Sequence, residues 1–185
     1  MIPISTVFYS SVILFGLIGC LRGWAKEIIV SFSVILALFV EHVLIEYVLP
    51  LAGIMFDTWP KPIQFYSSGI LFIVIAIFGY ASPTISSQLG SKVARENLQD
   101  FLLGFFLGML NGFLIIGTIL SFLHTADYGV TAERPDGVGG IIRPADDSRS
   151  GKLLQSLPPQ LIEKSTVWLY IAVAAAFVFV IVVFI

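Results

Sequence analysis

Charge is scarce in this chain, and its scarcity excludes most soluble folds. Lys, Arg, Asp and Glu make up 12% of the 185 residues, while hydrophobic residues make up 57%. Soluble domains carry about 25% charged residues. The formal net charge is −2 and the sequence has no basic cluster, so a nucleic-acid partner is not expected. The composition predicts a one-domain integral membrane protein with most of its length in lipid.

Cysteine and histidine are rare as well. Cys20 is the one cysteine, so the chain can form neither an internal disulfide nor a thiolate metal site. The two histidines are His42 and His124, and no set of Ser, His and Asp or of Cys and His has spacing that indicates catalysis. Asp146 and Asp147 come without further oxygen ligands, which makes a poor calcium site. We expect no enzymatic activity, no metal and no cofactor.

The sequence contains five long apolar segments with few charged residues. Each is about long enough to span a hydrocarbon core of roughly 30 Å at about 1.5 Å per residue. A short amphipathic pattern between the third and fourth predicts a helix along the membrane interface at 84–98. The five segments are 2–21, 28–49, 63–81, 101–123 and 167–185.

These segments predict an all-α integral membrane protein: a compact helical bundle of four spans with interfacial amphipathic helices, plus a fifth C-terminal span. Residues 1–164 form the four-helix membrane domain, which includes an outer loop at 124–166 and an amphipathic tail. Residues 165–185 form the C-terminal transmembrane helix.

Lys and Arg in the short connections predict the orientation of the chain. Lys61 is alone on one side of the membrane, and the other basic residues of these connections lie on the opposite side. This bias places the N-terminus outside and, with five spans, the C-terminus in the cytoplasm. The basic residues on the cytoplasmic side are Arg22, Lys26, Lys92 and Arg95.

The fourth segment carries a ladder of glycines, Gly104, Gly108 and Gly112, each four positions after the last. This spacing keeps them on one face of a helix, because each step overshoots a full turn by only about 40°. Without side chains, the face lets another helix backbone approach closely. Asn111 lies beside the ladder and is placed to hydrogen-bond across helices, a contribution of about 1 kcal/mol. A pore lined by backbone is the alternative role for the ladder.

A charged turn separates the first two segments and contains Arg22, Gly23, Lys26 and Glu27. Its basic residues hold the turn in the cytoplasm; alternatively, Arg22 and Lys26, four apart, contact an anionic lipid headgroup.

Asp100 stands directly before the ladder helix. Its carboxylate is placed to cap the free N–H groups at the start of that helix and to oppose the positive end of the helix dipole. The alternative is a salt bridge from Asp100 to Arg22 or Lys26, which ties the two cytoplasmic turns together.

Glu41, His42 and Glu46 are the ionisable side chains that we place within an apolar segment. His42 and Glu46 are four apart and share a helix face. Intramembrane ionisable residues are candidates for proton or ion relays. The alternative is that the segment leaves the membrane early and that the three side chains meet water.

Two stretches resemble the colicin V production protein family of bacterial inner-membrane proteins. GLIGCLRGWAKEIIVSFSVILALF at 16–39 is similar to the turn between the family's first two helices, G-x-x-x-G/R-G-x-x-R/K-E. LQDFLLGFFLGMLNGFLIIGTILSFL at 98–123 is similar to its fourth helix, D-x-x-x-G-x-x-x-G-x-x-x-G. The tail DSRSGKLLQSLPPQLIEK resembles the family's amphipathic ending, so the resemblance extends over about 1–164.

The chain departs from the family's pattern at three points. Ser5 and Thr6 occupy a region where members often carry an acid, Asn111 stands where arginine is common, and a fifth span follows the usual four. The resemblance implies an inner-membrane protein linked to colicin V production, biofilm and envelope phenotypes.

For function, we predict a small scaffold or accessory subunit that uses its glycine face and last segment to bind itself, as a homo-oligomer, or larger membrane partners, in contact with membrane lipids. A transporter or channel component that uses Glu41 and His42 is one alternative. A membrane anchor for a separately encoded partner is another.

Overall fold

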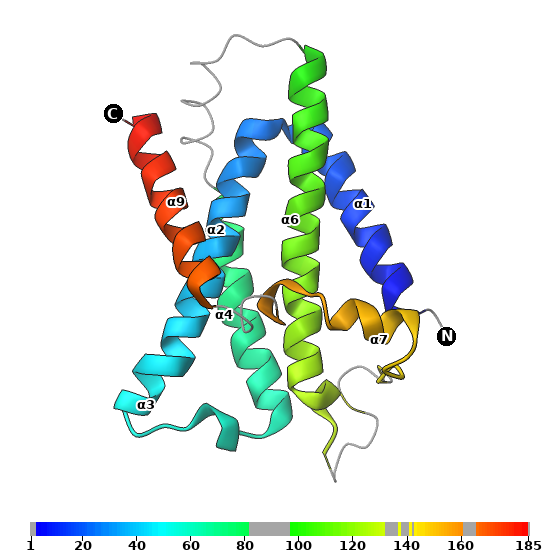
Figure 1. Cartoon of the computed structure of the whole chain (residues 1–185), viewed down its shortest axis with the longest axis vertical. Helices are drawn as coiled ribbons and strands as arrows, with labels where there is room; N and C mark the ends of the chain where they lie inside the picture. Colours follow the sequence, from blue (N-terminus) through cyan, green and yellow to red (C-terminus); the bar gives the residue numbers. More distant parts are fainter. Residues whose placement is uncertain are drawn as a thin grey trace.

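The computed structural model describes residues 3–81, 97–131, 137, 141, 143–160 and 166–184, and the regular structure in these ranges is helical. Neighbouring long helices alternate in direction (Figure 1). Their number and composition confirm an all-α fold with four helices able to span a membrane. These four are Ile4–Arg22, Trp24–Leu51, Lys61–Ala81 and Leu98–Thr125.

A single residue, Gly23, joins α1 (Ile4–Arg22) to α2 (Trp24–Val43). Its φ of +83° lies in a region that glycine enters without steric strain, and its N–H donates to the Gly19 carbonyl at 2.9 Å. The second helix therefore begins four residues earlier than the predicted segment. It continues through a π-helical turn, η1 (Leu44–Val48), into α3 (Leu49–Leu51).

The third and fourth long helices begin and end close to the predicted apolar segments. After a 3₁₀ turn, η2 (Phe56–Thr58), α4 (Lys61–Ala81) starts behind Pro60 with Pro62 in its first turn, where a missing N–H is tolerated. α6 (Asn97–Thr125) extends the predicted ladder segment at both ends. The predicted amphipathic helix at 84–98 lies, except for its last two residues, outside the described residues.

Beyond α6 the chain turns sharply and then packs back against the bundle. In the 3₁₀ turn η3 (Asp127–Gly129), Asp127 and Tyr128 have φ of 48° and 57°, a backbone region that costs non-glycine residues about 1–3 kcal/mol. Burial raises the pKa of Tyr128, and the nearby Arg143 opposes that rise. α7 (Arg149–Leu154) packs on α1 and α6, and a shared apolar core contains Phe8, Val12, Leu123, Tyr128, Leu153, Leu154 and Leu157.

The predicted fifth span corresponds to α9 (Thr166–Phe184). Within the part of α9 whose side chains are described, the apolar stretch is Val167–Val178, which does not confirm a fifth membrane span. α9 packs mainly on α2, through buried Leu169 and Ala176. The C-terminus lies at the same end of the molecule as the turn between α1 and α2 (Figure 1).

α1 and α6 form the most extensive helix contact, and glycine lines both sides of it. A Cβ added to Gly19 would collide with the Gly104 carbonyl oxygen and lie 2.9 Å from the Gly108 Cα. A Cβ on Gly108 would meet the backbone of Phe15, and one on Gly112 would lie 2.7 Å from the Phe15 Cβ. The face that the sequence offers to a partner is therefore occupied by α1.

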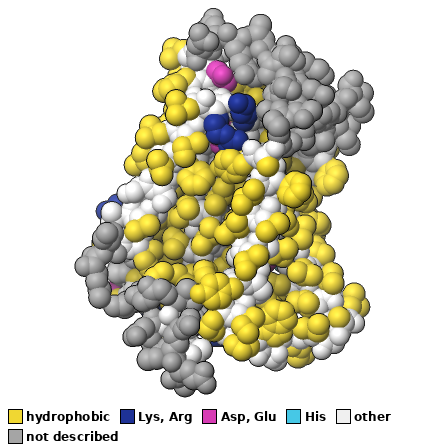
Figure 2. Space-filling view, turned by 180° about the vertical axis from the view of Figure 1, so that it is seen from behind, with side chains coloured by type: hydrophobic (Ala, Val, Ile, Leu, Met, Phe, Trp, Pro, Cys, Tyr) yellow, Lys and Arg dark blue, Asp and Glu magenta, His cyan; other side chains and the backbone are white. Residues whose placement is uncertain are grey.

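Several polar residues are buried in this bundle among the apolar core residues, and large apolar residues also lie on its outside. Large hydrophobic side chains cover much of the face seen in Figure 2. The exposed large hydrophobic residues of the whole bundle include Ile70 of α4 and Phe106 of α6. The fully buried side chains include Glu27, Asn111, Thr118 and Ser121. Exposed apolar side chains together with buried polar side chains are expected of a helical protein whose solvent is lipid.

Gly19→Ala is expected to destabilise the bundle by about 1–3 kcal/mol, because two backbones in direct contact must move apart to admit the methyl group. Unfolding of the full-length protein in detergent, followed by circular dichroism, measures this. Gly69→Ala is the matched control, since Gly69 is also buried in a helix but nothing lies within 4 Å of its added Cβ. Better helix propensity should stabilise the control by up to about 1 kcal/mol. Equal stability of the two variants would contradict this packing.

Candidate functional site

Four polar residues from three helices form a cluster beside the α1–α2 turn, which we call the turn cluster: Arg22, Glu27, Ser31 and Asn111. Glu27 lies in the first turn of α2 and is 1% exposed. Because Gly23 reverses the chain in one residue, the Arg22 guanidinium at the end of α1 reaches the Glu27 carboxylate, with Nη1 and Oε1 2.6 Å apart. This buried carboxylate thus has a cationic partner, which lowers the cost of burying it.

Asn111 brings α6 into the turn cluster and uses both ends of its amide. Its Nδ2 donates to the Glu27 carboxylate at 2.8 Å and to the Glu27 carbonyl at 2.9 Å. Its Oδ1 accepts a hydrogen bond from the Ser31 hydroxyl at 2.7 Å. Asn111 is fully buried, so α2 and α6 are joined by a hydrogen-bonded contact that excludes solvent.

Tyr80, at the end of α4, closes the turn cluster from a fourth helix. The Arg22 guanidinium carbon lies 4.4 Å from the centre of the Tyr80 ring, within the range of a cation–π interaction. The Tyr80 hydroxyl is buried and has no hydrogen-bond partner among the described residues. Arg22 therefore contacts a carboxylate and an aromatic face at once.

Asp100, in the first turn of α6, reaches the start of a different helix. Its Oδ1 accepts a hydrogen bond from the Trp24 backbone N–H at 3.3 Å, so it caps α2. A Cβ on Gly23 would lie 3.0 and 3.1 Å from the two carboxylate oxygens, closer than most Cβ contacts. The Asp100 carboxylate thus joins α6 to the α1–α2 turn through a backbone N–H. The Glu27 carboxylate forms the ion pair with Arg22.

A second polar region lies near the other end of α2, α4 and α6 and surrounds a cavity of about 260 Å³, which we call the distal cavity. Glu41 lies at this cavity and accepts a hydrogen bond from the Ser68 hydroxyl of α4 at 3.0 Å. The cavity brings the predicted residues of α2 together with residues of α4, α6 and the connecting loops. Its lining is Glu41, His42, Ile45, Glu46, Phe56, Asp57, Gln64, Ser68, Ser121, Phe122, Thr125, Ala126 and Pro159.

Gln64 holds one wall of the distal cavity in place. Its Nε2 donates to the carbonyl oxygens of Phe56, Asp57 and Trp59 at 3.3, 3.2 and 2.8 Å. These contacts fix the loop before α4, which supplies Phe56 and Asp57 to the lining. The wall is therefore anchored to a helix, as a preformed binding site requires.

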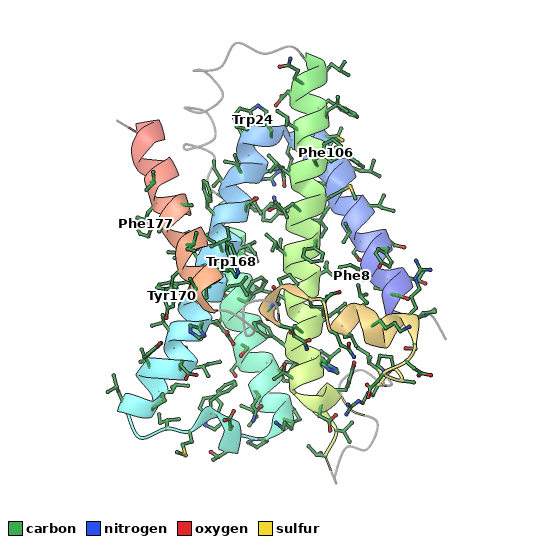
Figure 3. All side chains as sticks on the ribbon, viewed as in Figure 1. Phe8, Trp24, Phe106, Trp168, Tyr170 and Phe177 are labelled. Atoms are coloured by element: carbon green, nitrogen blue, oxygen red, sulfur yellow. The ribbon has the colours of Figure 1, made fainter. Side chains whose placement is uncertain are left out.

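His42 is positioned by aromatic rings. Tyr47 and Tyr170 lie edge-on to its imidazole, with ring centres 6.2 and 6.3 Å away. The Nε2 atom of His42 is buried and has no hydrogen-bond partner among the described residues. Tyr170 belongs to α9 (Figure 3), so this contact joins α9 to the end of α2.

An apolar layer separates the turn cluster from the distal cavity. Glu27 and Glu41 are fourteen positions apart on α2, which corresponds to about 21 Å along a helix. Between these levels the buried residues of α2 and α4 form one packed apolar cluster, with α6 side chains against it. Its buried members in this region are Val34, Ala37, Leu38, Phe72 and Ala76.

Sequence reasoning located parts of both regions and missed others. It placed Glu27 in a turn, whereas the structure places it inside α2, so Glu41, His42 and Glu46 are not alone within an apolar helix. Ser31 was missed, although it lies one helical turn after Glu27. Ser68 and Ser121 come from other helices, so their proximity to Glu41 has no signal in the local sequence.

Four long apolar helices packed around buried polar residues define a multi-pass helical membrane protein. The family model described as colicin V production protein matches residues 4–134, and the chain belongs to this family. The match extends from α1 through η3 and ends before α7 and α9. A search of curated proteins gives no match, and neither does a search of solved structures.

The ion pair of the turn cluster predicts energetic coupling between Arg22 and Glu27. Arg22→Gln and Glu27→Gln should each lower the free energy of unfolding in detergent. The double variant should lose less than the sum, with a coupling of about 0.5–3 kcal/mol, because either change alone already removes the pair.

Lys26→Gln is the matched control, because it removes one positive charge from the same turn at an exposed position. Its effect should add to that of Glu27→Gln without coupling. Strict additivity in the Arg22 cycle would show that the ion pair contributes nothing to stability.

Proposed function

We propose that this protein is a non-catalytic scaffold or accessory subunit of the bacterial inner membrane, with its N-terminus outside and its C-terminus in the cytoplasm. Membership of the colicin V production family supports a role linked to colicin V production or to the cell envelope. The charged turn of α1 and α2 supports the orientation, because Arg22 and Lys26 lie at the end opposite Lys61.

The observation that carries the proposal is the placement of α9. The glycine ladder is buried against α1, so it is not the surface that receives a partner. α9 packs mainly on α2 and leaves large side chains exposed, including Trp168, Ile171 and Phe177; Figure 3 marks two of them along the helix. Aromatic residues exposed on a peripheral helix are suited to anchor a second membrane protein.

A groove between α2 and α9 supports the same role. It has a volume of about 160 Å³ and is lined only by apolar side chains: Phe32, Ile35, Leu36, Val173, Ala176 and Phe177. An apolar side chain of a partner helix can fill such a groove by van der Waals packing, which is what drives helix association in lipid. The partner is a membrane helix, either of another protein or of a second copy of this chain.

A transporter or channel component is the second candidate, and the distal cavity is the observation in its favour. Glu41 and His42 line that cavity, as a relay would need. Between the level of Glu41 and the level of Glu27, the described polar side chains of α2 and α4 are Ser31, Ser33 and Tyr80, and all three lie toward the turn cluster. A binding site reached from one end fits this arrangement better than a conducting path.

The scaffold proposal predicts that the full-length protein leaves the membrane in a stoichiometric complex. Trp168→Ala with Phe177→Ala should lower partner occupancy at least about tenfold, because both remove exposed aromatic anchors. Mass spectrometry after extraction in mild detergent measures occupancy, and light scattering measures the size of the complex.

Ile70→Ala with Phe106→Ala is the matched control, because these residues are equally exposed on α4 and α6. The control should retain the complex, and both double variants should unfold at the wild-type temperature. A wild-type protein that is monomeric and alone under these conditions would contradict the scaffold role.

A further inference from the structure

We propose that the distal cavity binds a small organic ammonium ion. This inference goes beyond the scaffold role and does not depend on it. Three carboxylate residues line the cavity, Glu41, Glu46 and Asp57, and no Lys or Arg is among its described lining residues. The charge of the lining therefore favours a cation.

Glu41 supplies the main anionic contact. Its side chain is partly buried, and the one hydrogen bond described for it comes from Ser68. An ionised carboxylate accepts about four hydrogen bonds, so Glu41 retains capacity toward the cavity. A carboxylate in an apolar helix gains most from a partner that is also charged, because both charges are then compensated away from water.

Ser121 gives a second and independent indication of a ligand. It lines the cavity from α6 and is 1% exposed, and no hydrogen bond to its hydroxyl is described within the part of the chain that the structure describes. The Ser121 hydroxyl is therefore available to donate a hydrogen bond to, or accept one from, a ligand in the cavity.

The remaining lining selects an organic cation over a bare ion. Phe56 and Phe122 place aromatic rings at the cavity, and aromatic faces attract ammonium groups with apolar substituents. The described residues contain no group of three His, Cys, Asp or Glu placed to hold a metal ion. The volume of about 260 Å³ also exceeds the share of one water molecule, about 30 Å³, so it accepts a molecule of several heavy atoms.

The ligand reaches the cavity from the aqueous phase at this end of the bundle. Glu46 and Asp57 are exposed, so the lining is continuous with solvent on that side. On the other side the apolar layer that contains Phe72 and Ala76 closes the bundle. The site is therefore a one-ended pocket, which binds and releases its ligand at the same face.

Titration of the full-length protein in nanodiscs with choline and with butylammonium, followed by saturation-transfer NMR, tests the proposal. We expect saturable binding of at least one of them with a Kd of about 1 mM or tighter. Dimethylbutanol, the uncharged carbon analogue of choline, should bind at least about tenfold more weakly. Glu41→Gln should weaken ammonium binding at least about tenfold, because it removes the anionic contact and keeps the shape.

Asp147→Asn is the matched control, because Asp147 is an exposed acid outside the cavity; its binding should equal the wild type. Ser121→Val is the second variant, used if Glu41→Gln fails to fold. The valine side chain obstructs the cavity without changing its charge, so this variant should also weaken binding. The proposal is overturned if neither ammonium ion saturates, if dimethylbutanol binds as well as choline, or if folded cavity variants bind like the wild type.

Discussion

The direct contact between the backbones of α1 and α6 is the constraint on which the rest of the structure depends. Gly19 and Gly104 face each other with no side chain between them, so the two helix axes lie as close as backbone atoms allow. That approach fixes the rotation of α6 about its axis. Asn111, the residue before Gly112, is thereby turned toward α2, where its amide meets Glu27. The close contact between α1 and α6 thus also positions the hydrogen bonds between α6 and α2.

Burying Glu27 is costly, and the turn cluster offsets the cost with groups from three helices. Arg22 compensates the charge, the Asn111 amide donates twice, and Ser31 fixes the amide from its other end. If the Glu27 carboxylate had only some of these partners, the protein would be less stable than with an apolar residue there, because an unpaired buried charge costs several kcal/mol. Such a network tolerates few alternative helix arrangements, so it specifies one packing of α1, α2 and α6 at a cost in stability.

The four long helices could be predicted from the sequence because apolar length and glycine spacing are local signals. Gly104, Gly108 and Gly112 indicated a packing face, but their partner could not be identified, since any helix with a small-residue stripe would fit the same face. Glu27 was assigned to a turn because charges near Gly23 resemble a solvated loop, and a one-residue connection has no compositional signature. Asp100 lies in the first turn of its own helix, as the sequence predicts, and the tertiary fold also brings its carboxylate to the Trp24 N–H, a contact without a local sequence signal.

The single-residue turn at Gly23 has a consequence for how the protein enters the membrane. The end of α1 and the start of α2 are joined by one residue, so the two helices form a helical hairpin. The ion pair that neutralises Glu27 lies within this hairpin, since Arg22 is only five positions away. The hairpin can therefore enter the bilayer with its buried carboxylate already compensated, before α6 has been synthesised. α6 then adds the Asn111 amide and the glycine contact to a hairpin in which Arg22 already neutralises Glu27.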